Sequence, residues 1–328
     1  MTETALQAHL LRVHVTAKDP IALREQAGPA LRGAFYQALQ ERFCINRGTR
    51  SCTQCPLLQT CPVATLVAPL RDEPSRIRAV PCSFAIRPPE HSVHTLKPGD
   101  PLVFGVTLFG RRLELFPYVA MALQTMGKNG MGQRVETSAW QRGRFTVDRL
   151  QIVNPLTGQQ QTIQEAGKSQ LVFPDLPTTW SDALMRAAQL PSQHVTLHFI
   201  TPLRLKEDRG YVTRPLLLPL VKRLLERYDF LALDNGSTPF TKQEREQLLE
   251  QAAAVEIVRD DTQWTLTRSH SSRQRKTVSI AGLTGTVAYS GELKPLLPLL
   301  VWGTVMQVGK ATTKGNGIYE IEACTGTL

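Results

Sequence analysis

The sequence predicts an α+β protein of two tandem domains, each with the order strand, helix, strand, strand, helix, strand. Two observations carry this prediction. Apolar residues alternate with polar ones in segments typical of strands and recur every three to four positions in segments typical of helices. In addition, a loop rich in glycine and lysine follows the last helix of each half, at 127–134 and again at 309–317. The repeat of one such unit indicates an internal duplication.

The elements of the first half follow in order from the N-terminus. A strand is expected at 9–16, and a helix from Asp19-Pro20 to about Phe43, which Gly28-Pro29 breaks into two pieces. The remaining elements are strands at 78–86 and 102–109, a helix at 116–126 and a strand at 145–153. We therefore place the first domain at 1–153.

The second half repeats this order after a polar stretch at 154–192, which is rich in Gln, Thr and Pro and is expected to be a linker or an excursion. The second domain, at 193–328, is expected to contain strands at 194–201, 255–267, 277–289 and 318–321, with helices at 215–228, 241–254 and 293–306. The βαββαβ order is that of the ferredoxin-like fold, also called the split βαβ motif. The predicted fold is therefore two tandem ferredoxin-like domains.

Four cysteines, Cys44, Cys52, Cys55 and Cys61, fall within 18 residues of the first half with the spacing C-x7-C-x2-C-x5-C. Four thiolates can close a tetrahedral shell around zinc, so the pattern predicts a Cys-rich insertion with a structural zinc. An iron–sulfur cluster would accept the same four ligands, and unligated or redox-paired cysteines are the remaining alternatives.

The chain of 328 residues has a formal net charge of +10, with an isoelectric point near 9.5. Such a balance favours a polyanionic partner, above all a nucleic acid. The N-terminus lacks the basic and apolar regions of a signal peptide, and no apolar run reaches the roughly 18 residues that span a bilayer. We therefore expect a cytoplasmic protein with no membrane partner, whose thiols stay reduced.

The loop at 309–317 carries the residue types that contact phosphate. Its glycines let the backbone approach an anion closely, and its lysines and threonines supply cationic and hydroxyl groups. Nucleic-acid contact is expected from Gly309, Thr312, Thr313, Lys314, Gly315 and Gly317. A tight turn that only reverses the chain is the alternative. The earlier loop would extend the same surface through Lys128 and Arg134, or would merely be a soluble turn.

A second basic stretch joins the two strands of the hairpin predicted at 255–289. Arg268, Arg273, Arg275 and Lys276 surround His270 there. We expect these cations to contact phosphate, which makes His270 a candidate for acid–base chemistry. A plain phosphate-contact loop is the alternative for the same residues.

Five segments resemble the CRISPR-associated endoribonucleases of the repeat-associated (RAMP) superfamily, which process precursor crRNA. They are Pro98-Gly99-Asp100 with Leu108-Phe109-Gly110, Met126-Gly127 through Arg142-Gly143-Arg144-Phe145, Phe199-Ile200-Thr201-Pro202-Leu203-Arg204-Leu205-Lys206, Gly282-Leu283-Thr284-Gly285 with Tyr289-Ser290-Gly291, and Val308 through Gly315. The resemblance spans nearly the whole chain, and the terminal Gly-rich loop is its most specific part.

The resemblance implies cleavage of CRISPR repeat RNA without a catalytic metal. In such enzymes the ribose 2′-hydroxyl attacks the neighbouring phosphate and leaves a 2′,3′-cyclic phosphate and a 5′-hydroxyl. Many members place a histidine on or just after the first helix, whereas this chain has none between His14 and His91. His270 is therefore the first catalytic candidate. The alternative acids or cations are Tyr36, Arg32, Lys310 and Lys314.

Two other readings compete with the nuclease. A non-catalytic crRNA-binding subunit of a CRISPR effector complex would explain the missing histidine, and other subunits of that complex would then be partners. A zinc-dependent DNA-binding or regulatory module built on the cysteines would leave most of the chain without a role. The double unit with its terminal Gly-rich loop favours the nuclease.

Overall fold

The computed structural model describes residues 6–23, 25–49, 52–58, 60–67, 82–90, 95–134, 141–168, 170–207, 210–271 and 276–322. The chain divides into two compact units. We call His9–Asn154 with Gln159–Pro177 the N-terminal unit. The C-terminal unit consists of Thr178–Leu328 with the short segments Met1–Ala8 and Pro155–Gly158.

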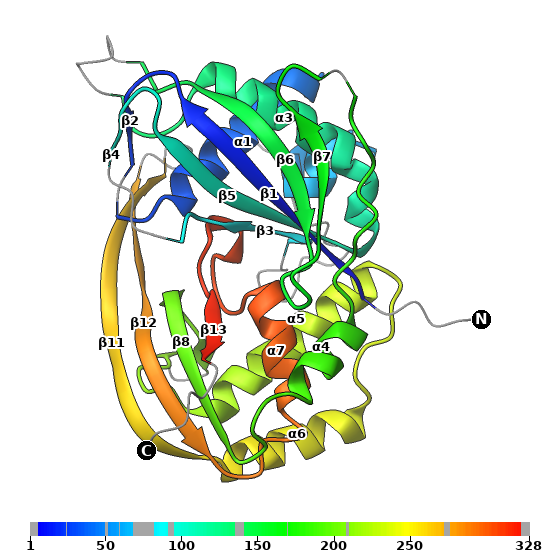
Figure 1. Cartoon of the computed structure of the whole chain (residues 1–328), viewed down its shortest axis with the longest axis vertical. Helices are drawn as coiled ribbons and strands as arrows, with labels where there is room; N and C mark the ends of the chain where they lie inside the picture. The colour runs from blue at the N-terminus through cyan, green and yellow to red at the C-terminus, as the bar shows by residue number, and fades with distance from the viewer. Residues whose placement is uncertain are drawn as a thin grey trace. The chain divides into compact units, whose positions relative to one another are not determined.

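The N-terminal unit is built on a five-stranded sheet with the order β3-β5-β1-β6-β7. Its strands are β1 (Ala8–Ala17), β3 (Phe84–Arg87), β5 (Pro101–Phe109), β6 (Phe145–Val153) and β7 (Gln160–Glu165), and β2 (Ile21–Ala22) pairs separately with β4 (Thr95–Leu96). The main helices α1 (Gly28–Phe43) and α3 (Phe116–Asn129) pack side by side on one face of the sheet (Figure 1). The first four strands of this order are those that the predicted βαββαβ unit requires, and β7 extends the edge.

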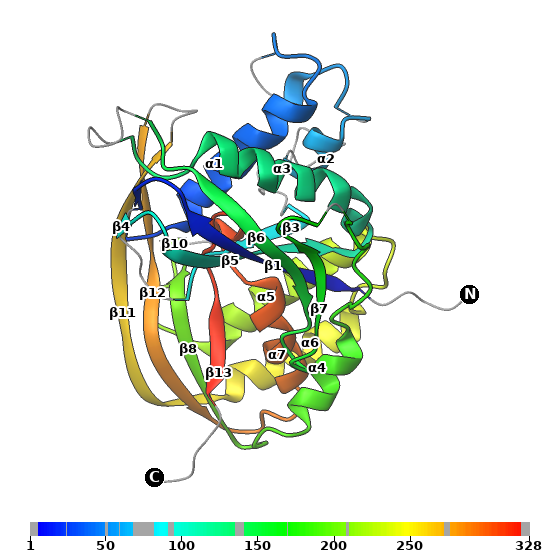
Figure 2. The same ribbon diagram turned by 45° about the horizontal axis from the view of Figure 1, so that its top comes forward.

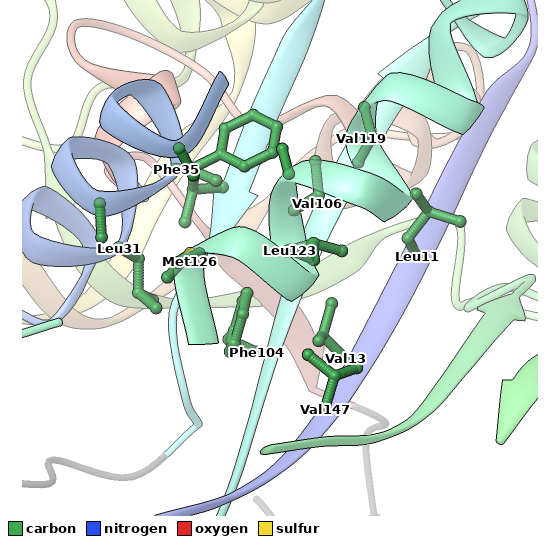
Figure 3. Packing of buried hydrophobic residues seen from close by; sticks show 14 of the residues in the cluster. Leu11, Val13, Leu31, Phe35, Phe104, Val106, Val119, Leu123, Met126 and Val147 are labelled. Atoms are coloured by element: carbon green, nitrogen blue, oxygen red, sulfur yellow. The ribbon is translucent and has the colours of Figure 1, made fainter. Parts of the chain in front are cut away.

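The core of this unit lies between the sheet and these two helices (Figure 3). Alternate residues of β1 point into it, because successive side chains of a strand face opposite sides. Helix α3 contributes Val119, Leu123 and Met126, which share one helical face and are at most 1% exposed. Phe35 of α1 packs against Phe84 of β3 at a centroid distance of 6.2 Å. The apolar periodicity of the sequence therefore accounts for this layer.

The C-terminal unit is built on a four-stranded antiparallel sheet with the order β11-β12-β8-β13. Its strands are β8 (His194–Leu203), β11 (Glu256–Ser271), β12 (Lys276–Ser290) and β13 (Tyr319–Glu322), and β9 (Lys206–Glu207) forms a short hairpin with β10 (Gly210–Tyr211). Its helices are α4 (Trp180–Ala187), α5 (Leu217–Asp234), α6 (Lys242–Ala254) and α7 (Leu297–Met306). The helices lie on one face of the sheet (Figures 1 and 2).

Buried tyrosines tie the helices of the C-terminal unit to its sheet. The Tyr319 hydroxyl donates to the Leu300 carbonyl oxygen at 2.6 Å, and the Tyr289 hydroxyl donates to the Pro215 carbonyl oxygen. Burial raises the pKa of both phenols far above the ordinary value, so both stay neutral donors. Trp180 of α4 stacks edge-on against Trp302 of α7 at 6.3 Å.

Most predicted elements are present, with differences at two places. Helix α1 begins at Gly28 rather than near Asp19, because Pro29 suits the first helical turn and Ile21–Ala22 pairs with β4 instead. The stretch expected as a linker contains β7, which pairs with β6, and α4, which opens on a capping box of Thr179 and Asp182. Residues 78–81 of the strand predicted at 78–86 lie outside the described residues.

Within the described part of the chain, none of the helices combines the length and the apolar character that crossing a membrane requires.

Two short elements, η1 (Cys52–Gln54) and α2 (Pro62–Val67), occupy the segment between α1 and β3. Helix α2 buries Val63, Leu66 and Val67 against the N-terminal core. The segment that carries the clustered cysteines is therefore attached to its unit by apolar contacts.

Candidate nucleic-acid interface

The terminal loop, which we define as residues 307–318 between α7 and β13, is a tightly closed turn. Val308 donates its N–H to the Gly317 carbonyl oxygen at 3.0 Å, and Gly317 donates to the Pro202 carbonyl oxygen at 3.2 Å. A Cβ on Gly317 would lie 1.7 Å from the Val308 carbonyl oxygen, and the residue has φ +72°. Glycine at this position is therefore required by both space and backbone conformation.

The side chains of this loop divide between its surface and its interior. Lys310 is exposed, and Thr313 and Lys314 are half-buried. Thr312 is 5% exposed, and Gly315 and Gly317 are also buried. The burial of these last three residues gives them a place in shaping the loop, and their contact with nucleic acid stays a prediction. The more accessible of the candidate residues in the loop are Gly309, Lys310, Thr313 and Lys314.

Two residues that the sequence did not single out lie beside Lys310. Arg204, just after β8, places its guanidinium carbon 4.0 Å from the ring centroid of Tyr211 on β10. The Lys310 ammonium lies 5.9 Å from the same centroid. Lys310 also donates its backbone N–H to the Arg204 carbonyl oxygen at 3.0 Å. Arg204 lies in one of the segments that carried the resemblance, whereas no pattern in the sequence pointed to Tyr211.

The earlier Gly-rich loop of the N-terminal unit is anchored in the same way. Gln133 donates its N–H to the Ala22 carbonyl oxygen at 2.8 Å, as Lys310 does to Arg204 at 3.0 Å. In both units the acceptor follows the first strand of the sheet, directly in the case of Arg204 and five residues later in the case of Ala22. This shared anchor agrees with the duplication that the sequence predicts.

Cations gather around the earlier loop. Lys128 and Arg134 are exposed. Burial, together with the nearby charge of Arg134, lowers the pKa of Arg142, and its guanidinium donates to the Gln37 side-chain oxygen at 3.3 Å. Arg144 makes an ion pair with Asp19 at 2.7 Å, and its hydrogen bond lowers the pKa of that carboxyl. The N-terminal unit therefore has its own basic surface. The sequence predicts Lys128 and Arg134 as part of it, but not Arg142.

The backbone of the basic hairpin continues as strand to Ser271 and resumes at Lys276, with Arg268 opposite Ser279 and His270 opposite Thr277. Pairing between β12 and β8 ends at Leu283 and Leu203, so this part of β11 and β12 projects as a two-stranded ribbon (Figure 1). Arg273 and Arg275 lie outside the described residues, as do the side chains of Arg268, His270 and Lys276. Their contacts with a ligand stay predictions.

Tyr36 sits on α1 in a closely packed setting. Its hydroxyl accepts a hydrogen bond from Gln40 Nε2 at 2.8 Å and lies 3.6 Å from Cys52 Sγ. The Arg32 guanidinium stands 5.0 Å from the ring centroid, and the ring packs against the N-terminal core. This environment serves the fold of the unit and makes Tyr36 a weaker catalytic candidate than His270 or Lys310.

The four clustered cysteines all have free, half-buried thiols. Cys44 ends α1, Cys52 begins η1, and Cys55 donates its N–H to the Cys52 carbonyl oxygen at 3.1 Å. Asn46 donates to Cys55 Sγ at 3.5 Å. Among the residues that the structure describes, no three or more His, Cys, Asp or Glu side chains are placed to hold a metal ion. The thiols therefore share one segment without forming a closed coordination shell.

Two family models match the chain, one on each half. Residues 6–175, about half of the 328 residues, match the AF_1859_N family, described as an N-terminal domain. Residues 197–319 match the family described as CRISPR-associated endoribonuclease Cas6, and this range contains the terminal loop with Lys310 and Tyr211. No curated protein sequence matches the chain.

Solved structures agree with the fold. A Cas6 product complex has 15% identity and a TM-score of 0.57 over 96% of this chain and 99% of that chain. A structure described as Thermus thermophilus Cas6 has 12% identity and a TM-score of 0.55 over 97% of this chain and 100% of that chain. A partial Cas6-RT-Cas1–Cas2 complex has 15% identity and a TM-score of 0.60 over 100% of this chain and 48% of that chain.

Identities this low bear on the fold alone. The Cas6 match covers the sheet of the C-terminal unit from within β8 to the start of β13, together with the loop whose residues carried the resemblance. The chain therefore belongs to the AF_1859_N family through residues 6–175, and its residues 197–319 match the CRISPR-associated endoribonuclease Cas6 family.

Proposed function

We propose that this protein is the endoribonuclease that cuts CRISPR repeat RNA during crRNA maturation. The observation that carries the proposal is the Cas6 endoribonuclease match at 197–319, which contains a closed Gly-rich loop with an exposed lysine. The net charge of +10 favours binding of such a polyanion. In this proposal the two units are tandem ferredoxin-like domains.

The proposed reaction is attack of a ribose 2′-hydroxyl on the adjacent phosphate, with no catalytic metal. The O2′–P bond forms as the P–O5′ bond breaks, which leaves a 2′,3′-cyclic phosphate and a 5′-hydroxyl. A general base takes the 2′ proton, an acid protonates the leaving oxygen, and cations stabilise the pentacoordinate phosphate. We assign the base to His270 and a cation to Lys310, because Lys310 is exposed on the terminal loop. Tyr36 ranks last, since its hydroxyl already accepts from Gln40.

Incubation of the purified protein with repeat RNA in excess EDTA tests this proposal. We expect cleavage of the all-ribose RNA, a cyclic phosphate end on the upstream product, and no cleavage when the nucleotide before the cut carries a 2′-deoxyribose. His270→Ala is then expected to slow cleavage by about 100- to 10,000-fold while RNA affinity changes little. Cleavage of the deoxy RNA, or a requirement for divalent metal, would contradict the mechanism.

The second candidate function is a crRNA-binding subunit that does not cut. The absence of histidine from 15 to 90, which includes all of α1, favours it. Tight binding of both RNAs with neither cleaved would establish this function and overturn the nuclease. Because the similar structures include a Cas6 product complex and a Cas6-RT-Cas1–Cas2 complex, we propose repeat RNA and other CRISPR proteins as partners in either case.

Zinc at Cys44, Cys52, Cys55 and Cys61 stays a prediction from their spacing, and no step of the reaction depends on it. Metal analysis of protein purified without chelators is expected to give one zinc per chain, and a double Cys52→Ser, Cys55→Ser variant is expected to lose it. An iron–sulfur cluster would instead give visible absorbance. Protein that folds and holds neither metal would show that the thiols are unligated.

A further inference from the structure

The short β9–β10 hairpin is fixed at its base rather than hanging free. Lys206 pairs with Tyr211 across it, and Val212 donates its N–H to the Leu205 carbonyl oxygen at 3.0 Å. The Glu207 carboxylate accepts from Lys222 Nζ at 3.2 Å and from Arg223 at 3.1 Å, both on α5. These contacts join the hairpin to a long helix of the same unit.

The hairpin and the terminal loop are also joined through their backbones. Lys310 donates its N–H to the Arg204 carbonyl oxygen at 3.0 Å, and a Cβ on Gly309 would lie 2.7 Å from that same oxygen. The backbone positions of Lys310 and Tyr211 are therefore both set by the chain around Arg204. The two side chains need no rearrangement of main chain to act on one ligand.

Tyr211 is accordingly a fixed aromatic ring beside two cations, and its side chain is not sealed inside the protein. The residue is 40% exposed, with the Arg204 guanidinium carbon at 4.0 Å and the Lys310 ammonium at 5.9 Å from its centroid. Lys310 is exposed, so an anion can reach its ammonium beside this ring.

A strand of RNA offers an anion and a flat π-surface in every nucleotide, which is the combination that this cluster matches. We infer that Tyr211 stacks against a base of the bound RNA while Lys310 holds an adjacent phosphate. This rests on the proposed function, because it assigns positions within the RNA-binding face of the C-terminal unit. The guanidinium of Arg204 packs on the Tyr211 ring and thereby fixes the orientation of the ring. Tyr211 thereby selects for an unpaired, accessible base at one position of the RNA.

The test measures the affinity of the full-length protein for repeat RNAs in which each nucleotide in turn is abasic. At one position, loss of the base is expected to weaken binding to the wild type by about 5- to 150-fold. The same abasic RNA is expected to bind Tyr211→Ala no more weakly than intact RNA does, because the stacking partner is already gone. Tyr211→Phe keeps the ring and is expected to restore the wild-type pattern.

The salt dependence of RNA affinity distinguishes the phosphate contact of Lys310 from the base stacking of Tyr211. Lys310→Ala is expected to reduce the slope of log affinity against log salt by about 0.7, the contribution of one phosphate contact on a single strand. Tyr211→Ala is expected to lower affinity with the slope unchanged. Leu233→Ala is the matched control, because it removes a side chain of the same unit that is 66% exposed on α5. It is expected to change neither quantity.

The outcomes distinguish this inference from the function on which it rests. If the wild type binds no repeat RNA, the proposed function fails. If the wild type binds repeat RNA but tolerates an abasic nucleotide at every position, the stacking role of Tyr211 is overturned while the function stands. Should Tyr211→Ala lower the unfolding midpoint, Tyr211→Leu takes its place in the abasic series, because leucine keeps apolar bulk at this position without an aromatic face.

Discussion

Replacing Gly317 with alanine is expected to destabilise the C-terminal unit by about 3 kcal/mol or more and to abolish RNA binding through the terminal loop. The added methyl group would lie 1.7 Å from the Val308 carbonyl oxygen, so the backbone itself must move. That movement breaks the hydrogen bond from Val308 to Gly317 and the one from Gly317 to Pro202. The loop would then no longer hold Lys310 against Arg204.

Gly158→Ala is the control that separates the steric clash at Gly317 from the strain of its left-handed backbone conformation. Gly158 has φ +77°, close to the +72° of Gly317, but nothing lies within 4 Å of its Cβ position. It also belongs to the C-terminal unit. Alanine there carries only the strain of the left-handed conformation, about 1–2 kcal/mol. Urea unfolding and RNA affinity are measured on both variants, and equal losses would show that conformation rather than space makes Gly317 necessary.

Local periodicity was enough to predict most of the fold. Helix α3 and strand β6 carry unbroken apolar patterns, and the structure places them within three residues of the predicted ends. Strand β7 could not be found in this way, because Gln160–Glu165 is mostly polar and is held by pairing with β6. The strand depends on pairing with β6, which the side-chain pattern of 160–165 itself does not indicate.

The candidate site likewise has features that the sequence indicates and features that only the three-dimensional structure shows. Composition identified the terminal loop, but it could not say that Thr312 is buried while Lys310 is exposed. Arg204, Tyr211 and Lys310 come together because β8, the hairpin and the loop after α7 meet in three dimensions. Cysteine spacing likewise predicts a shared ligand only if the backbone brings the thiols into one shell. Spacing fixes neither that geometry nor the neighbours of a side chain.

Gly303→Ala is the second substitution with a large expected effect, and its cause lies in the core. A Cβ at Gly303 on α7 would lie 2.0 Å from the Tyr319 hydroxyl oxygen and 2.6 Å from Leu224 Cδ2. Tyr319 is fully buried, and its hydroxyl donates to the Leu300 carbonyl oxygen at 2.6 Å. Alanine must displace that hydroxyl from its acceptor, so we expect a loss of about 3 kcal/mol or more in the free energy of unfolding.

The chain provides both a control and a rescue for this prediction. Gly33 on α1 has nothing within 4 Å of its Cβ position, so Gly33→Ala is expected to stabilise the protein by up to about 1 kcal/mol through helix propensity. Tyr319→Phe removes the oxygen that the new methyl group would strike. The double variant Gly303→Ala, Tyr319→Phe is therefore expected to be more stable than Gly303→Ala alone, as measured by urea unfolding. Purely additive losses would place the strain at Leu224 instead. Because Tyr319 begins the strand that follows the terminal loop, a shifted ring would also move that loop, and RNA affinity should fall and recover together with stability.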